Sequence, residues 1–326
     1  KFNKKPDLHI FVFDALIPNY TSNKYLDIKE TSYYKLLKKE KAIIFKNSFT
    51  DIPGTGSTLN ALLYLNTEEY LKLDERYNFF NGIDNSPLFS LFKYNDYKIA
   101  TSFHFKKSKR GNFVDIDIAT EGFTTPSYCN LEGRVYKIRF LGSCLISFYF
   151  FDENTDIANN INHLIEDNQP LLSINYINYP SHIAEDNITK YKKKFLKNQE
   201  KVKDIMKLTI QQLNKNNSIL LFLGDHGTLR TNWPRLNYKD NLNLIIEDQQ
   251  MVLIALIDEN NICSNIFINT KFKFVTPILV LENILKCLTN KVNVTAKKND
   301  YSIFYDINTM KKVETKFTKY DFLYEN

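Results

Sequence analysis

The sequence lacks the patterns that mark several classes of protein. Its 326 residues include only four cysteines, and no two of them have the close spacing of a zinc-binding or redox motif. The longest apolar run, residues 140–151, is too short and too interrupted by glycine and serine to cross a bilayer. No internal repeat, low-complexity linker or signal peptide is recognisable. We therefore expect no transmembrane segment in this chain and no cysteine-based metal centre.

The charge of the chain is also modest, at a net +6, and its lysines are scattered. A nucleic-acid-binding domain usually gathers its basic residues on one face, so nucleic acid is not an expected partner, whereas anionic substrates remain open. The first residue is Lys1 and not methionine, which leaves two locations open. The chain is either a domain excised from a cell-envelope or periplasmic protein, or a cytoplasmic protein.

The four cysteines differ in their surroundings. Cys144 and Cys287 lie in apolar stretches, where a buried free thiol is the simplest expectation. Cys129 and Cys263 lie in more polar stretches and are expected to form disulfides only in an oxidising compartment.

Strand-like apolar runs alternate with helical patterns along the chain. The predicted strands are residues 9–14, 42–49, 97–103, 131–151, 171–179, 219–224 and 251–257, with an edge strand at 301–307. The predicted helices are residues 31–41, 85–94, 157–167, 187–214 and 277–288, and a further helix follows the loop at 51–58. This alternation predicts an α/β fold with a mostly parallel central sheet flanked by helices, and no firm boundary divides residues 1–326 into domains.

Acid and imidazole side chains follow several of the predicted strands. Asp225 and His226 come directly after the strand at 219–224, and Asp14 ends the first strand. His104 and His182 follow two others. Parallel strands present their carboxyl ends at one edge of the sheet, so these side chains are expected to share one rim. Carboxylate and imidazole ligands suit a borderline divalent ion, with zinc the first choice and manganese the second. Gly227 is expected to let the backbone turn sharply beside them.

The loop at residues 51–58, Asp-Ile-Pro-Gly-Thr-Gly-Ser-Thr, leads into an amphipathic helix. The start of that helix carries three hydroxyls, those of Thr55, Ser57 and Thr58. Free N–H groups at a helix start favour a phosphate or sulfate, and a hydroxyl bound to a metal ion loses its proton more easily. Taken on its own, a hydroxyl at this position is better explained as a helix cap than as a catalytic group.

A second acidic motif, Asp115-Ile-Asp117, gives a different prediction. An Asp-x-Asp after an apolar residue is typical of glycosyltransferases that bind a metal–nucleotide. Here it lies in an alternating segment, where period two places both acids on the solvent face of a strand.

Taken together, these segments resemble the alkaline phosphatase superfamily. The matching segments, in order and spacing, are the strand ending at Asp14, the Thr55 loop, Ser181-His182 and the Gly-Asp-His-Gly of residues 224–227. The chain most resembles the sulfatase-like branch, which includes bacterial phosphoethanolamine transferases and lipoteichoic acid synthases of the cell envelope. The matches extend from residue 9 to residue 230. Residues 240–326 or so resemble the family only weakly and are expected to complete the sheet of a single catalytic domain.

The resemblance implies a role for each matching residue. Asp14, Thr55, Asp225 and His226 would bind the principal metal, and Thr55 would be the nucleophile, since it stands at the family's distance before the apolar pair Leu62-Leu63. Ser57 and Thr58 are the alternative nucleophiles, and Ser57 is otherwise expected to contact substrate. His182 would contact the substrate or a second metal. It would also protonate the leaving oxygen and later activate the acceptor. His104 falls, in a looser alignment, where sulfatases have a lysine.

Two departures from the family pattern refine this prediction. The Thr55 loop has no Cys or Ser followed by x-Pro-x-Arg, so the formylglycine of true sulfatases cannot form, and phosphate esters become the expected substrates ahead of sulfate esters. No histidine follows His226, although the envelope transferases have one. Either Arg230 and Arg235 bind the phosphate instead, or the enzyme keeps only one tightly bound metal. Without the family resemblance, both arginines are equally well explained as surface groups near Trp233.

The predicted function is therefore a metal-dependent phosphotransferase or phosphoesterase that acts through a phospho-threonine. The resemblance implies a phosphorylated small-molecule or lipid donor and, in a transferase, a glycan or lipid acceptor. Two alternatives remain: a glycosyltransferase that uses Asp115 and Asp117, and a non-catalytic relative that binds a glycan or a protein.

Overall fold

The computed structural model describes most of the chain. The described residues are 1–50, 52–65, 86–102, 115–117, 128–131, 135–140, 143–148, 169–180, 183, 187–213, 217–228, 247–268, 275–289, 301–305 and 312–316. For residues 116–117, 128–131, 135–140, 143–148, 301–305 and 312–316 only the backbone is described. The predicted helix at 157–167 lies outside the described residues.

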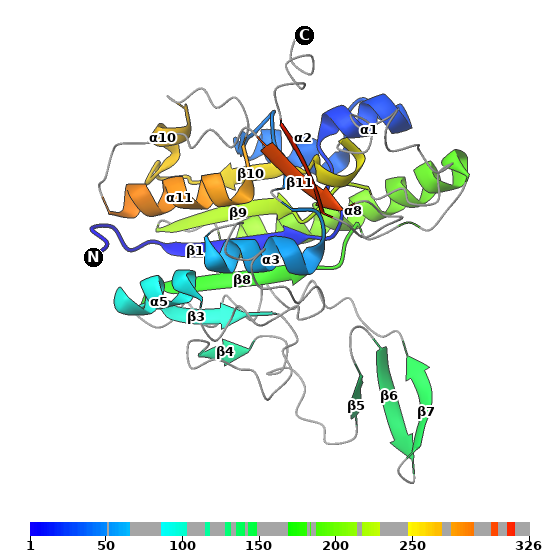
Figure 1. The fold of residues 1–326 in the computed structure, drawn as a ribbon, viewed down its shortest axis with the longest axis horizontal. Coiled ribbons are helices and arrows are strands. Elements are labelled where there is room, and N and C mark those ends of the chain that lie inside the picture. The colour runs from blue at the N-terminus through cyan, green and yellow to red at the C-terminus, as the bar shows by residue number, and fades with distance from the viewer. Residues whose placement is uncertain are drawn as a thin grey trace.

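A seven-stranded sheet forms the centre of the molecule, in the order β2-β10-β9-β1-β8-β3-β4 (Figure 1). Its strands are β1 (Asp7–Phe13), β2 (Ile43–Ile44), β3 (Lys98–Thr101), β4 (Ile116–Asp117), β8 (Leu171–Ile177), β9 (Ser218–Gly224) and β10 (Ile254–Ile257). The four pairings from β9 across to β4 are all parallel. Only β10 runs the other way, antiparallel to both β9 and β2. The predicted α/β fold with a mostly parallel sheet is confirmed.

Alternate residues of the central strands enter two separate cores. Leu8, Ile10 and Val12 of β1 pack into one core, together with side chains of α3 (Thr55–Tyr64), α5 (Pro87–Tyr94) and α11 (Pro277–Leu288). Phe11 and Phe13 pack into the other, with α1 (Asn19–Leu26), α2 (Ser32–Lys39) and α8 (Ile188–Leu213). The helices therefore cover both faces of the sheet, which explains why its central strands are buried along almost their whole length.

Two small antiparallel sheets lie outside the central one. One consists of β5 (Tyr128–Leu131), β6 (Val135–Phe140) and β7 (Ser143–Phe148), and the other of β11 (Tyr301–Tyr305) and β12 (Lys312–Lys316). The expected edge strand at 301–307 is thus wrong in its pairing, because β11 pairs with β12 and not with the central sheet. The strand predicted at 42–49 is reduced to two residues, Ile43 and Ile44.

A disulfide joins Cys263 to Cys287, so the prediction of a free thiol at Cys287 is wrong, whereas a disulfide at Cys263 was one of the expected outcomes. Cys263 follows β10 in a turn where its backbone N–H donates to Asp258 Oδ2 over 2.6 Å, just before α10 (Ser264–Ile268). Cys287 lies in the last turn of α11. Both residues are buried in the same core, so Cys287 is not a free thiol and Cys263 is not at a polar surface.

Among the described residues, no helix combines the length and the apolarity needed to cross a membrane.

Candidate functional site

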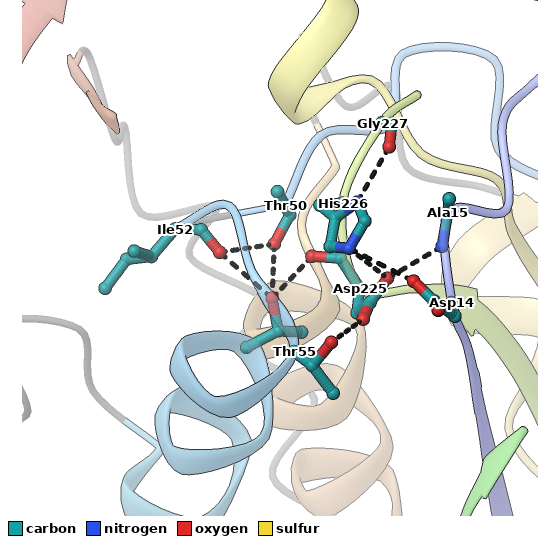
Figure 2. A network of polar contacts seen from close by, with 9 residues as sticks. Asp14, Ala15, Thr50, Ile52, Thr55, Asp225, His226 and Gly227 are labelled. Atoms are coloured by element: carbon teal, nitrogen blue, oxygen red, sulfur yellow. Dashed lines mark hydrogen bonds and ion pairs between the residues drawn. The ribbon is translucent and has the colours of Figure 1, made fainter. Parts of the chain in front are cut away.

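The candidate site lies at the carboxyl ends of β1 and β9. These strands are parallel neighbours, with Phe13 opposite Gly224, so the next residues along, Asp14 and Asp225, come side by side. His226 Nε2 lies 3.2 Å from Asp14 Oδ1 and 3.5 Å from Asp225 Oδ1 (Figure 2). One ligand atom from each of the three residues falls within 4.8 Å of the others, and all three side chains are buried. Two segments that are distant in the sequence, one ending at Asp14 and the other containing Asp225 and His226, therefore form one compact group of ligands.

Asp225 is held in place by the backbone that follows Asp14. The N–H of Ala15 donates to Asp225 Oδ1 over 2.9 Å (Figure 2). Ala15 has a φ of 60°, a left-handed conformation that costs a non-glycine residue about 1–2 kcal/mol. This turn directs the amide of the residue after Asp14 toward the other carboxylate.

Thr55 is the first residue of α3, and its hydroxyl points to the same carboxylate. Thr55 Oγ1 donates to Asp225 Oδ2 over 2.5 Å. The preceding residue, Gly54, has a φ of 114°, which L-amino acids other than glycine rarely adopt. Gly54 therefore sets the entry of the chain into α3 and, with it, the place of the Thr55 hydroxyl, which remains partly exposed.

Thr58, one turn further along α3, contacts the backbone of Asp225. Its hydroxyl lies 2.6 Å from Asp225 O, 3.0 Å from Ile52 O and 2.9 Å from Thr50 Oγ1. Thr58 is buried, and these contacts occupy its hydroxyl, so the structure gives this alternative nucleophile a positioning role. Ser57, the other alternative, is partly buried on the same turn.

Gly227 is required for a different reason from the one predicted. Its φ is not in the left-handed region, but a Cβ at this position would lie 2.1 Å from the carbonyl oxygen of Asp248. The N–H of Gly227 also donates to Gln249 O over 2.8 Å. The backbone of the Asp-His-Gly motif thus packs directly on residues 247–250, and a side chain would separate them.

Two acids of residues 247–250, Asp248 and Glu247, make further polar contacts that the sequence did not reveal. Thr228 Oγ1 donates to Asp248 Oδ1. The buried carboxylate of Glu247 accepts from Lys24 Nζ at 2.8 and 3.0 Å and from the Tyr25 hydroxyl, both on α1. No local sequence signal marks these pairs, because each joins residues 20 or more positions apart.

The buried charges of the site shift each other's pKa values. Burial raises the pKa of Asp225, and the neighbouring Asp14 adds to that rise, while His226 opposes it. For His226, burial alone would lower the pKa, but the charges of Asp225 and Asp14 outweigh burial and raise the pKa to about 9. His226 therefore holds its proton more tightly than an ordinary histidine, and its ring lies beside the two carboxylates.

These residues fit a divalent metal ion. The three buried side chains, two of them carboxylates, bring their ligand atoms within 4.8 Å of one another, and buried groups of this kind are usually paired or bound to a metal. Two carboxylates, one imidazole and the Thr55 hydroxyl are oxygen and nitrogen ligands of the kind that zinc and manganese accept. The chemistry of this group supports a divalent cation without identifying which one.

The remaining predicted site residues are not placed by the structure. His104, His182, Arg230 and Arg235 lie outside the described residues, so their roles stay predictions. Of the Asp-x-Asp motif, the side chain of Asp115 is described, and it accepts from Lys93 Nζ and from the Ile99 N–H at 2.7 Å. Asp115 thus joins α5 to the edge of the sheet, an arrangement that does not favour the metal–nucleotide alternative.

Comparison with known proteins identifies the fold. The sequence matches no protein-family model and no curated protein. The structure is similar to the C-terminal periplasmic domain of EcEptC from Escherichia coli, with a TM-score of 0.58 at 14% identity over 97% of this chain and 93% of that domain. The same domain in complex with Zn gives a TM-score of 0.54 at 14% identity, over 88% of this chain and 83% of that one.

Two other solved structures extend the comparison. The soluble domain of lipooligosaccharide phosphoethanolamine transferase A from Neisseria meningitidis has a TM-score of 0.56 at 11% identity, over 90% of this chain and 94% of that one. The 2-O GAG sulfatase BT1596 has a TM-score of 0.53 at 13% identity, over 92% of this chain and 77% of the sulfatase chain. The likeness is one of fold, and the predicted alkaline phosphatase and sulfatase-like architecture is confirmed.

Proposed function

We propose that this protein is a metal-dependent enzyme that transfers or hydrolyses phosphate esters through a covalent phospho-threonine at Thr55. The observation that carries the proposal is the 2.5 Å contact between Thr55 Oγ1 and Asp225 Oδ2. It places a partly exposed hydroxyl against a member of the buried group formed by Asp14, Asp225 and His226. A hydroxyl beside a metal-ligand group is the arrangement that nucleophilic catalysis requires.

The chemistry follows from these positions. A divalent ion held by the triad would lower the pKa of the Thr55 hydroxyl and neutralise charge on the phosphate. Thr55 Oγ attacks phosphorus in line as its proton passes to Asp225 Oδ2, the acceptor of its hydrogen bond, and Thr55 takes that proton back when it is released. The bond between phosphorus and the leaving oxygen breaks as the new bond forms, and the leaving oxygen takes a proton from His182 or, alternatively, His104. The same histidine then removes a proton from water or from an acceptor hydroxyl, which attacks phosphorus and releases Thr55.

The helix start contributes to binding of the phosphate. Thr55 is the first residue of α3, so the positive end of the helix lies next to the nucleophile. The partial positive charge would stabilise the negative charge that collects on the phosphate oxygens during transfer. Phosphate esters are favoured over sulfate esters because a threonine cannot be converted to the formylglycine that true sulfatases use.

The broader setting is part of the proposal. Proteins with this fold include a phosphoethanolamine transferase and a periplasmic domain of Escherichia coli, which supports a place in the bacterial cell envelope. We infer a phosphorylated small-molecule or lipid donor and, if the enzyme is a transferase, a glycan or lipid acceptor. The proposed ion is zinc, with manganese as the second choice.

Three measurements test the proposal. Elemental analysis of protein purified without chelator should find a divalent metal close to one equivalent, and its absence with no affinity for added zinc or manganese would favour a non-catalytic binder. A screen of phosphate mono- and diesters, with sulfate esters alongside, should show metal-dependent turnover of a phosphate ester. Acid-quenched reactions should then yield a phosphorylated peptide that contains Thr55, and phosphorylation elsewhere would refute the assigned nucleophile.

A further inference from the structure

A third strand end lies beside the two that carry the metal ligands. β8 is the parallel neighbour of β1 on the side away from β9, and Phe13 is opposite Ile177. The ladder continues one step beyond these strands, because the N–H of Asp14 donates to Ile177 O over 2.9 Å. In a parallel pair, a residue that bonds to position 177 lies opposite position 178. Asn178 is therefore the direct neighbour of Asp14.

Asn178 also lies on the same face of the sheet as the metal ligands. Side chains alternate along a strand, and Ile177 belongs to the core under α8, as Phe13 does. Asp14 and Asn178, one residue further on, consequently belong to the opposite face, which α3 covers. Three strand ends thus present a row of polar side chains to the start of α3, in the order Asp225, Asp14, Asn178.

One end of the Asn178 amide has no partner among the described residues. The side chain is partly buried, and its Oδ1 atom is shielded from solvent yet has no hydrogen-bond partner in the part of the chain that the structure describes. Asn175, three residues earlier and on the other face, also has a shielded Oδ1 without a partner in that part of the chain, but its N–H₂ group donates to Ser173 Oγ over 3.0 Å. The two ends of an amide exchange places by a half-turn, so an amide whose oxygen is unbonded is free to present its N–H₂ group instead.

We propose that Asn178 is a substrate-binding residue whose side-chain amide donates a hydrogen bond to an oxygen of the anionic phosphate held at Thr55 and the metal triad. This inference rests on the function proposed above and adds a binding residue to that site. On this proposal, the phosphate oxygens that face away from Asp225 bind on the side of Asp14 where β8 ends.

A neutral amide suits this position better than a charged side chain. Asp14 and Asp225 already supply negative charge for a cation, so a third carboxylate would repel the phosphate. A lysine or arginine in contact with Asp14 would neutralise it and compete with the ion for its oxygens. An amide donates to a phosphate oxygen without either effect.

Binding of inorganic phosphate to the zinc-loaded protein provides the test. In the wild type and in Asn178→Ala and Asn178→Asp, the Kd of inorganic phosphate is measured by calorimetry and the Kd of Zn²⁺ by competition with a chelator. Asn178→Ala should weaken phosphate binding by about 10- to 100-fold, the range for losing one hydrogen bond to a charged group, and leave the Zn²⁺ Kd within a few-fold of wild type. Asn178→Asp should weaken phosphate binding further and tighten Zn²⁺ binding, since it adds a carboxylate.

The matched control is Asn175→Ala, on the same strand but the opposite face. It removes a buried hydrogen bond and should lower the melting temperature, yet leave the phosphate Kd of the folded protein unchanged. An equal phosphate Kd for wild type and Asn178→Ala would overturn the assignment of Asn178 and leave the proposed function intact. Weaker Zn²⁺ binding in Asn178→Ala, to the same extent as phosphate binding, would instead make Asn178 part of the metal site. A wild type that binds Zn²⁺ but no phosphate would contradict the proposed function itself, and the role of Asn178 with it.

Discussion

The hydroxyl of Thr55 donates to the carboxylate of Asp225 across 2.5 Å, although 170 residues separate them in the sequence. Asp225 follows the central strand β9, and Thr55 begins the helix that covers that face of the sheet. The contact therefore fixes the distance between the helix start and the metal triad. A change on either side of it should appear first in catalysis or metal binding.

Replacing Thr55 by alanine should abolish turnover and leave the fold and the metal in place. The hydroxyl is the proposed nucleophile, so its loss should lower kcat by about three orders of magnitude or more, as the loss of other nucleophiles does. Thr55→Ser keeps a hydroxyl and should retain much of the activity. The measurement is steady-state turnover of the best phosphate ester, with metal content and circular dichroism recorded for each variant. Full activity in Thr55→Ala would show that another group attacks phosphorus.

Replacing Thr58 by valine should loosen the site without removing any metal ligand. Valine keeps the shape of threonine but loses the hydroxyl that lies 2.6 Å from Asp225 O and 3.0 Å from Ile52 O. Ile52 O keeps the Thr50 hydroxyl as a donor over 3.1 Å, but the buried carbonyl of Asp225 loses the Thr58 hydroxyl, which should reduce the free energy of unfolding by about 1–3 kcal/mol. Metal affinity should also fall, whereas Thr58→Ser should restore both. Urea unfolding and a chelator competition give the two values, and wild-type metal affinity in Thr58→Val would confine Thr58 to a role in stability.

The strand ends were predictable because two simple patterns coincide there. A buried parallel strand is a short apolar run, and Asp14 and Asp225 each stand directly after one. Once both strands belong to one parallel sheet, their following residues must lie on the same rim. The sequence therefore predicted that Asp14, Asp225 and His226 would be neighbours, and the structure brings them together with Thr55.

The features that the sequence did not reveal are those that depend on contacts between distant segments. The Cys263–Cys287 disulfide depends on the packing of α11 against the turn after β10, which polarity along the chain does not report. Gly227 appeared to be a turn residue, but its role is the close approach of Asp248, a neighbour only in space. The pairing of β11 with β12, and not with the central sheet, is likewise decided by partners that strand propensity does not specify.

Replacing Gly227 by alanine should disturb the metal site through the backbone. The added Cβ would lie 2.1 Å from Asp248 O and 2.7 Å from the carbonyl carbon, so one of the two segments must move. Overpacking of this kind costs about 1–3 kcal/mol of stability. Because His226 is the preceding residue, the movement should also weaken metal binding. Thermal unfolding and the Zn²⁺ Kd test this, and an unchanged Kd would mean that residues 247–250 yield in place of the motif.

Removing the disulfide should destabilise the protein and leave the metal site unaffected. Cys263 and Cys287 are 24 residues apart, and a loop of that size stabilises the folded state by about 3.5 kcal/mol on the chain-entropy account. The bridge lies near the start of β1, since Lys4 Nζ donates to Ile262 O and the Asn3 N–H to Leu288 O, both over 2.7 Å. Asp14 lies at the other end of that strand. The double variant Cys263→Ala, Cys287→Ala should thus unfold at lower urea with a wild-type Zn²⁺ Kd, and a lost metal site would contradict this separation.

Metal binding should become tighter as the pH rises toward about 9. Burial would lower the pKa of His226, but Asp225 and Asp14 raise it to about 9, so the metal-free site holds a proton that an incoming ion must displace. Below that pH, the apparent affinity should increase about tenfold per pH unit, and above it the dependence should flatten.

The stability of the metal-free protein should change with pH in the opposite direction. The raised pKa of His226 stabilises the folded state fully below the unfolded-state pKa of about 6.5, and this stabilisation is lost as the pH passes 9. Chelator competition across this range, with proton release measured by calorimetry in two buffers, tests the first effect, and urea unfolding of the chelated protein tests the second. His226→Gln should remove both dependences, and a pH-independent Kd in the wild type would show that His226 is already neutral before the metal binds.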